Sequence, residues 1–162
     1  MTYIDYSYYS SLHDTVQEKD FNRLVVAAQH KLDDLTTGVD GVRKLKHAFP
    51  VDEEDAQLVR ICMAELVNTM YKVEKLEKTA SALTETESGV HSNVITSVSA
   101  GNESVDYAEP GAVKNTIGAA VQSTKARNGL YYGIVRDYLS GVPDANGVNL
   151  LYMGPYPYTI KT

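Results

Sequence analysis

The sequence predicts a mainly α protein, a small helical bundle with a protruding β-hairpin and an extended C-terminal tail. Three features support this fold class: two long segments with apolar residues at helical spacing, a short alternating pattern near residue 100, and an apolar end interrupted by prolines. The 162 residues suit one domain with a buried core. We expect the helical core at about 5–88 and 112–141, the hairpin at 94–108 and the tail at 148–162.

The segment from Asp52 to Lys78 has the clearest helical period in the chain. Asp52 follows Pro50 and is a predicted N-cap, and the acidic residues after it suit the positive end of the helix dipole. One face carries a stripe of apolar residues that lie within about 60° of its centre. The stripe consists of Val59, Cys62, Met63, Leu66, Met70 and Val73. We therefore expect the other helices to pack on this one.

Ile61 breaks the pattern of this central helix. It lies about 160° from the apolar stripe, on the face that carries Gln57, Ala64 and Asn68. A lone subunit would leave the Ile61 side chain in water. We therefore expect a second protein surface to cover it.

Two further helical segments precede the central helix. Asp5 can cap a short helix that reaches about Leu12. From Glu18 to Leu35 an apolar stripe recurs at helical spacing, and Gly38 follows as a stop signal. A short helix or turn is expected over Val42 to Phe49, with its basic cluster facing solvent.

The last helix is expected over at least 126–140, with a weak point at Asn128-Gly129. Apolar and aromatic residues recur there at helical spacing. Gly141 can end the helix in the left-handed conformation.

A β-hairpin is predicted before the last helix, because Val94 to Ser99 and Glu103 to Ala108 flank a Gly-Asn turn. Because an isolated hairpin is only marginally stable in water, we expect it to lean on the helices or on another subunit.

The stretch from Leu150 to Tyr158 is apolar and aromatic. Pro155 and Pro157 rule out a helix, so an extended backbone is expected. Tyrosine is favoured at interfaces, which predicts that this tail anchors the chain to a partner. A tail folded back on its own core fits the composition equally well.

Composition and charge exclude several classes of function. A net charge of -6 argues against wrapping nucleic acid. The single cysteine, Cys62, lies on the apolar stripe, where a small core residue is the better interpretation than a catalytic thiol, and no disulfide within the chain can form. The first ten residues are polar and rich in tyrosine, so we expect neither a signal peptide nor a membrane span, and synthesis in the cytoplasm.

The sequence has no recognisable motif for a catalytic, cofactor or metal site. The chain has no glycine-rich phosphate loop and no paired cysteines for zinc. His13-Asp14 resembles the dipeptide of metal phosphohydrolases, which need further His and Asp ligands on neighbouring helices; His30 and His47 are the candidates in this chain. The order of these residues differs from the order that such sites require, and His30 and His47 are expected on the surface. A small helical metal-dependent phosphohydrolase is therefore kept as the alternative function.

Several segments of the chain together form a recognisable pattern. They are the Tyr-rich start, the two amphipathic helices, Ile95-Thr96-Ser97-Val98-Ser99, Glu103-Ser104-Val105-Asp106-Tyr107, Tyr138-Leu139-Ser140-Gly141 and Leu150-Leu151-Tyr152-Met153-Gly154. In combination, the chain resembles the head-tail connector (adaptor) proteins of tailed bacteriophages over nearly its whole length. It departs from that pattern at the loop from Val142 to Asn149 and in the longer segment from Thr79 to Gly89.

The resemblance implies a structural virion protein without catalytic activity, assembled in the cytoplasm of a bacterial host. Its subunits would form a ring of about twelve beneath the portal and continue the DNA channel. The portal protein would bind one side of the ring, and a stopper or tail-completion protein the other. Double-stranded DNA would pass through without specific binding, in keeping with the acidic charge. A non-phage soluble helical adaptor is a second alternative.

The residues expected at partner interfaces combine the unexplained Ile61, the hairpin and the tail. They are Ile61, Ile95, Val98, Val105, Tyr107, Leu150, Leu151, Tyr152, Met153, Tyr156 and Tyr158.

Overall fold

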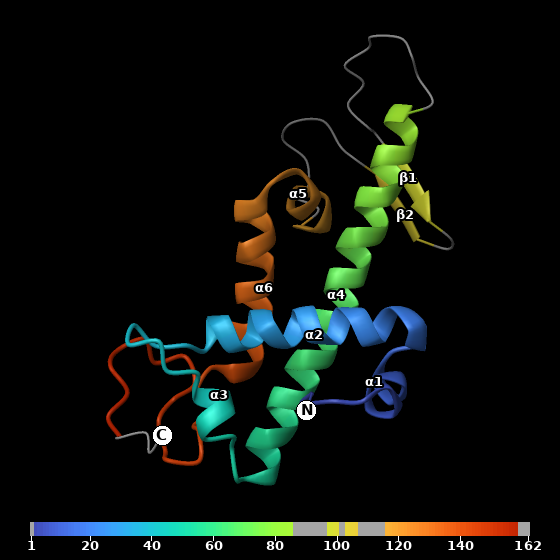
Figure 1. Cartoon of the computed structure of the whole chain (residues 1–162). Coiled ribbons are helices and arrows are strands. Elements are labelled where there is room, and N and C mark those ends of the chain that lie inside the picture. The colour runs from blue at the N-terminus through green and yellow to red at the C-terminus, as the bar shows by residue number, and fades with distance from the viewer. Residues whose placement is uncertain (1, 86–96, 101–102, 107–115, 159–162) are drawn as a thin grey trace. The chain divides into compact units, whose positions relative to one another are not determined.

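A computed structural model of the chain describes residues 2–85, 97–100, 103–106 and 116–158, and these are mainly helical (Figure 1). The elements in order are α1 (Tyr6–Leu12), α2 (Glu18–Leu35), α3 (Lys44–His47), α4 (Glu53–Glu85), β1 (Ser97–Ala100), β2 (Glu103–Asp106), α5 (Thr116–Gln122) and α6 (Thr124–Leu139). The predicted mainly α class is confirmed.

The chain divides into two compact units, where the sequence was interpreted as one domain. Unit 1 comprises Met1–Met70 and Tyr131–Thr162, and unit 2 comprises Tyr71–Leu130. The long helix α4 begins in unit 1 and ends in unit 2, and α6 begins in unit 2 and ends in unit 1.

The core of unit 1 is built from the two stripes that the sequence predicts on α2 and α4. The helix α2 crosses the first part of α4 (Figure 1). The buried stripe residues are Phe21, Leu24, Val25, Ala28 and Leu32 on α2 and Val59, Cys62, Met63 and Leu66 on α4. The core position of Cys62 is therefore confirmed.

The helix α1 begins where the sequence predicts. The carboxylate of Asp5 accepts a hydrogen bond from the backbone N–H of Tyr8 at 2.8 Å, which caps the helix. Tyr9 is fully buried, and its ring centroid lies 5.3 Å from that of Phe21. These contacts join α1 to α2.

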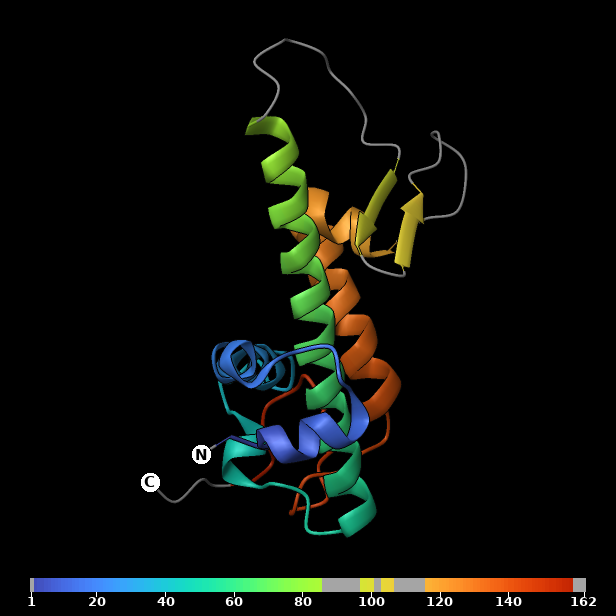
Figure 2. The same ribbon diagram turned by 90° about the vertical axis from the view of Figure 1, so that its right-hand side faces the viewer.

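The predicted water-facing side of α4 is covered by the chain itself, so that expectation is wrong. Ala64 and Asn68 are buried, and the hydroxyl of Thr15 donates to Oδ1 of Asn68 at 3.0 Å. The amide of Gln57 donates to the Tyr8 hydroxyl at 2.8 Å. Figure 2 shows α1 beside the first part of α4. Ile61 is consequently half-buried within its own subunit rather than left in water.

In unit 2, Arg127 joins three helices. Its guanidinium donates to a carboxylate oxygen of Glu77 on α4 and, through Nε, to the carbonyl oxygen of Ala120 on α5 at 3.0 Å. The helical run breaks at Ser123, between α5 and α6, and not at the predicted weak point Asn128-Gly129. The Ser123 hydroxyl accepts from the backbone N–H of Ala126 at 3.4 Å, as a side chain at a helix start does.

The strands β1 and β2 of unit 2 pair antiparallel, with Val98 opposite Val105 and Ser99 opposite Ser104. They lie inside the range 94–108 of the predicted hairpin. Ile95 and Tyr107 lie outside the described residues. The protrusion of this hairpin, and its contact with a partner, stay predictions.

The helix α6 ends in unit 1 as the sequence predicts, with Gly141 in the left-handed region at a φ of 91°. The extended tail is not supported, and the alternative of a tail folded back on its own core describes the structure better. Residues 148–158 fold back on unit 1, with the backbone N–H of Leu150 donating to the carbonyl oxygen of Val142 at 2.9 Å. Residues 159–162 of the predicted tail lie outside the described residues.

Candidate protein-interaction surface

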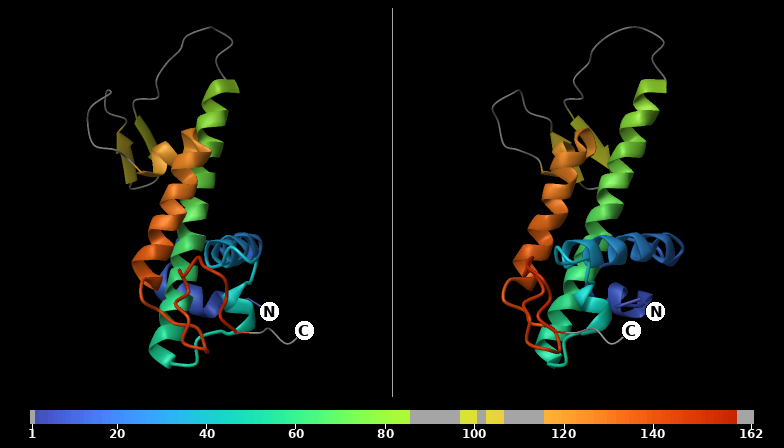
Figure 3. Two further views of the ribbon diagram at one scale, coloured as in Figure 1. Left: turned by 90° about the vertical axis from the view of Figure 1, so that its left-hand side faces the viewer. Right: turned by 60° about the vertical axis from the view of Figure 1, so that its left-hand side comes forward.

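Residues 148–158, here called the C-terminal segment, lie against the loop between α2 and α3. The backbone N–H of Val39 donates to the carbonyl oxygen of Met153 at 3.0 Å. The backbone N–H of Tyr156 donates to Oδ2 of Asp40 at 2.6 Å. Both views of Figure 3 show the segment near α3. The loop after α2 therefore forms the base on which the C-terminal segment rests.

Lys44, the first residue of α3, ties these parts together. Its side chain is fully buried, and its ammonium donates to the carbonyl oxygens of Thr36 at 3.0 Å, Leu150 at 3.0 Å and Tyr152. An ammonium has three N–H donors, so every donor has a carbonyl partner. Burial lowers the pKa of Lys44, and the nearby carboxylates of Asp144 and Asp40 oppose that shift. The prediction that the basic cluster around α3 faces solvent is wrong for Lys44.

Two glycines lie at close contacts, one between the loop and the C-terminal segment and one within the segment. A Cβ on Gly38 would lie 2.9 Å from the carbonyl oxygen of Gly154. A Cβ on Gly154 would collide with the ring of Tyr152. At Gly38 the loop therefore meets the backbone of the C-terminal segment at a distance that only glycine permits, whereas Gly154 makes room for the Tyr152 side chain of its own segment.

Tyr156 is held by two carboxylates. Its hydroxyl donates to Oδ2 of Asp144 at 2.5 Å, while its backbone N–H binds Asp40. The Tyr156 N–H is the main reason why the pKa of Asp40 lies below its ordinary value. Burial, followed by the bond to Asp144, raises the pKa of Tyr156. Both shifts favour the ionisation states that keep the segment in place.

The C-terminal segment and the loop on which it rests carry several exposed apolar side chains, here together called the C-terminal surface. It consists of Val39 (75% exposed), Tyr152 (47%), Met153 (52%) and Tyr158 (52%). Large apolar side chains gathered on one surface are typical of protein-binding sites, and tyrosine and methionine are enriched there. An exposed apolar surface of this kind is a candidate for contact with another protein.

The structure separates the predicted tail residues into two groups. Tyr152, Met153 and Tyr158 are exposed, as an interface requires. Leu150 is fully buried in unit 1, which corrects its assignment as a partner contact, and Leu151 and Tyr156 are half-buried. The reason is that Leu150 completes the core of its own chain.

Sequence reasoning missed Val39 and Lys44. The pattern Gly-Val-Asp-Gly does place Val39 in a turn, where an apolar residue is exposed, and this is the signal that could have identified it. No local signal marks Lys44, because its partners lie far along the chain.

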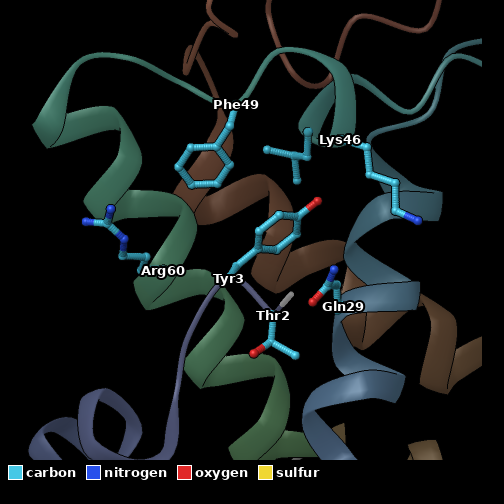
Figure 4. Close-up of a pocket in the computed structure, with 7 residues that line it drawn as sticks. Thr2, Tyr3, Gln29, Lys46, Phe49 and Arg60 are labelled. Carbon is cyan, nitrogen blue, oxygen red and sulfur yellow. The ribbon is translucent and has the colours of Figure 1, made fainter.

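Unit 1 also has an open cleft of about 350 Å³ between the N-terminal segment, α2, α3 and α4. Figure 4 shows the ring of Tyr3 in the middle, with Arg60 and Lys46 on opposite sides. The Tyr3 and Phe49 rings lie 5.4 Å apart between centroids. Both cations already have partners, since Lys46 lies 3.9 Å from Asp33 and Arg60 lies 2.8 Å from Glu53. The cleft therefore lacks a charge reserved for a ligand.

The residues of the phosphohydrolase alternative do not form a metal site. Nε2 of His13 lies 3.2 Å from a carboxylate oxygen of Glu65, and His30 and His47 are exposed. Within the described ranges, no group of three or more His, Cys, Asp or Glu side chains could hold a metal ion. That alternative has no support from these residues.

The chain has no counterpart in the comparisons with known proteins: no family model, curated protein or solved structure matches it. No helix in the part of the chain that the structure describes has the length and apolar character needed to cross a membrane.

Proposed function

We propose that this protein is a structural subunit of a tailed bacteriophage virion that joins the DNA-filled head to the tail. It forms a ring below the portal, binds the portal protein through the C-terminal surface, and leaves a channel for DNA. A stopper or tail-completion protein binds the opposite side of the ring. The resemblance of several sequence segments to head-tail connectors is the origin of this proposal.

The observation that carries the proposal is the exposed C-terminal surface on an anchored backbone. The side chains of Tyr152 and Met153 are exposed, while their carbonyl oxygens accept hydrogen bonds from the Lys44 ammonium and the Val39 N–H. Such a surface loses little conformational entropy on binding, because the segment is ordered beforehand. A subunit that must fit a fixed position in a large assembly benefits from this preorganisation.

The acidic charge of the chain supports the channel role. A net charge of -6 disfavours tight contacts with phosphates, which would slow DNA in transit. Ring formation requires two different surfaces on each subunit, since heterologous contacts close into rings. The C-terminal surface can supply one of these contacts or the portal contact, and the experiment below separates the two.

The test is a pull-down of the portal protein encoded in the same phage genome. The variant Tyr152→Ala with Met153→Ala should reduce portal binding at least about tenfold, in line with loss of a central interface residue. Val26 is an exposed apolar residue on α2, outside the C-terminal surface. The variant Val26→Ala is the matched control and should bind as the wild type does.

Electron microscopy of the purified protein, alone and with the portal protein, provides the second readout. Ring-shaped particles attached to the portal are expected. If the protein binds no portal and forms no ring, the phage assignment is wrong and an adaptor unrelated to phages becomes the better interpretation. Loss of rings with intact portal binding in the double variant would assign the C-terminal surface to subunit contacts instead.

A further inference from the structure

The surroundings of the Lys44 ammonium have the composition of a cation site. Three main-chain carbonyl oxygens converge on it, from Thr36, Leu150 and Tyr152. The carboxylates of Asp144 and Asp40 act on it electrostatically. Carbonyl and carboxylate oxygens are the ligands that hard cations prefer, and here the cation is part of the chain.

The cage joins three parts of unit 1 that are distant in sequence. Thr36 follows α2, Lys44 begins α3, and the other two carbonyls lie on either side of Leu151. Asp144, which is buried, also accepts hydrogen bonds from the backbone N–H groups of Asn146 and Val148 and from the Tyr156 hydroxyl. The same group of contacts therefore shapes the C-terminal segment from its start to Tyr156.

We propose that the Lys44 ammonium serves as a built-in monovalent cation that holds the C-terminal surface in shape, and that its carbonyl cage accepts a small ammonium ion when the side chain is removed. Lys44 is a positioning residue: it fixes the backbone of Tyr152, whose side chain is exposed for binding. Only the purpose of that surface rests on the proposed function. The cage itself follows from the contacts of unit 1.

Removing the cation should leave buried carbonyl oxygens without donors, which is costly. Lys44→Ala opens a cavity that methylammonium can enter, with its charge and N–H donors restored to the cage. Lys44→Met keeps the length of the side chain without donors or charge, and it fills the space that methylammonium needs. Only the alanine variant should therefore respond to the ion.

The experiment measures Tm and the hydrogen exchange of backbone amides in residues 148–156, in methylammonium chloride and in sodium chloride at equal ionic strength. Both variants should lose roughly 10 °C in Tm in sodium chloride and exchange faster in this segment. Methylammonium should restore several degrees and slow the exchange in Lys44→Ala alone, because binding to the folded state stabilises it.

Three outcomes would overturn the proposal. One is a Lys44→Met variant as stable as the wild type, another is an alanine variant that gains nothing from methylammonium, and the third is equal gain in both variants. If Lys44→Ala fails to fold, the expected result is recovery of a cooperative thermal transition on adding methylammonium, and its absence counts against the cage.

A measurement on the unaltered protein provides an independent check. An amine-acetylating reagent should modify the exposed Lys46 and spare Lys44 in the folded protein, as peptide mass spectrometry can show. Equal modification of the two lysines contradicts the buried cage. None of these readouts uses the portal, so the cage can be confirmed while the proposed virion role fails, or the reverse.

Discussion

The hydroxyl of Tyr3 donates a hydrogen bond of 2.7 Å to Oδ1 of Asp33 and so joins the N-terminal segment to α2. Asp33 is buried, and its second oxygen lies 3.9 Å from the ammonium of Lys46. Burial of Tyr3, together with the bond to the carboxylate, raises the pKa of the Tyr3 hydroxyl well above its ordinary value of 10.0. The neutral phenol is therefore part of the folded structure.

The first prediction concerns alkaline pH. Because the pKa of Tyr3 is raised in the folded state, its contribution to stability is fully present below about pH 10 and is lost as the pH rises further. Tyr3→Phe should lower the free energy of unfolding by about 1–2 kcal/mol near neutral pH and flatten its decline above about pH 10. Urea unfolding at a series of pH values measures both effects. Tyr132→Phe, at an exposed tyrosine, is the control, and an equal change in slope there would refute the assignment to Tyr3.

The second prediction concerns the thiol of Cys62, which is fully buried on α4. Burial raises its pKa to about 12, so the reactive thiolate is disfavoured in the folded state. Labelling by a thiol reagent should be slower than in the unfolded chain by a factor on the order of 1,000 or more, since it requires opening of the core. The rate of labelling, measured with and without urea, is the readout. Fast labelling of the native protein would show that the first part of α4 opens locally.

The third prediction compares two glycines of α6 and its end. Gly141 lies in the left-handed region, with a φ of 91°. Gly133 lies inside α6 without a positive φ, and a Cβ there would meet nothing within 4 Å. Gly141→Ala should lower the free energy of unfolding by about 1–2 kcal/mol, because alanine is strained in the left-handed region. Gly133→Ala should raise it by about 0.5–1 kcal/mol through helix propensity. Thermal or urea unfolding of both variants measures these changes. Two changes in the free energy of unfolding with the same sign would contradict this account.

Local patterns predicted the helices well. The apolar period of α2 gave its bounds as Glu18 to Leu35, and Asp5 was identified as the cap of α1 because both signals act within a few residues. The break at Ser123 was missed. The stretch from Ala119 to Ala126 has no glycine or proline to mark a helix end, and only the Ser123 hydroxyl, which caps α6, indicates the break.

Local patterns could not predict the interaction surface, because it depends on contacts between residues that are distant in the sequence. Lys44 and the carbonyl oxygen of Leu150 are 106 residues apart, and no sequence period connects them. A lysine in a basic run is normally solvated, so its burial depends on carbonyls that the folded chain alone brings together. Asn68 is a similar case, since a polar residue on α4 becomes buried through its bond to Thr15.

The last prediction separates folding from binding in the C-terminal segment. Leu150 is fully buried, so Leu150→Ala should lower the free energy of unfolding by about 2–5 kcal/mol through the lost contacts and the cavity. Tyr152→Ala removes an exposed side chain and should cost less than about 1 kcal/mol of stability. If the C-terminal surface binds the partner, Tyr152→Ala should instead weaken binding by about 2 kcal/mol.

Paired measurements on each variant, a thermal melt and a portal-binding assay, test this separation. Truncation after Asn149 removes both Leu150 and the Tyr152 carbonyl from the Lys44 cage, so it should lower Tm by many degrees as well as abolish binding. A truncated chain with an unchanged Tm would show that the C-terminal segment contributes little to the core. A Tyr152→Ala variant that melts like Leu150→Ala would show that the Tyr152 side chain supports the fold, because its ring packs over Gly154, and the binding contact would then have to come from Met153, Tyr158 and Val39.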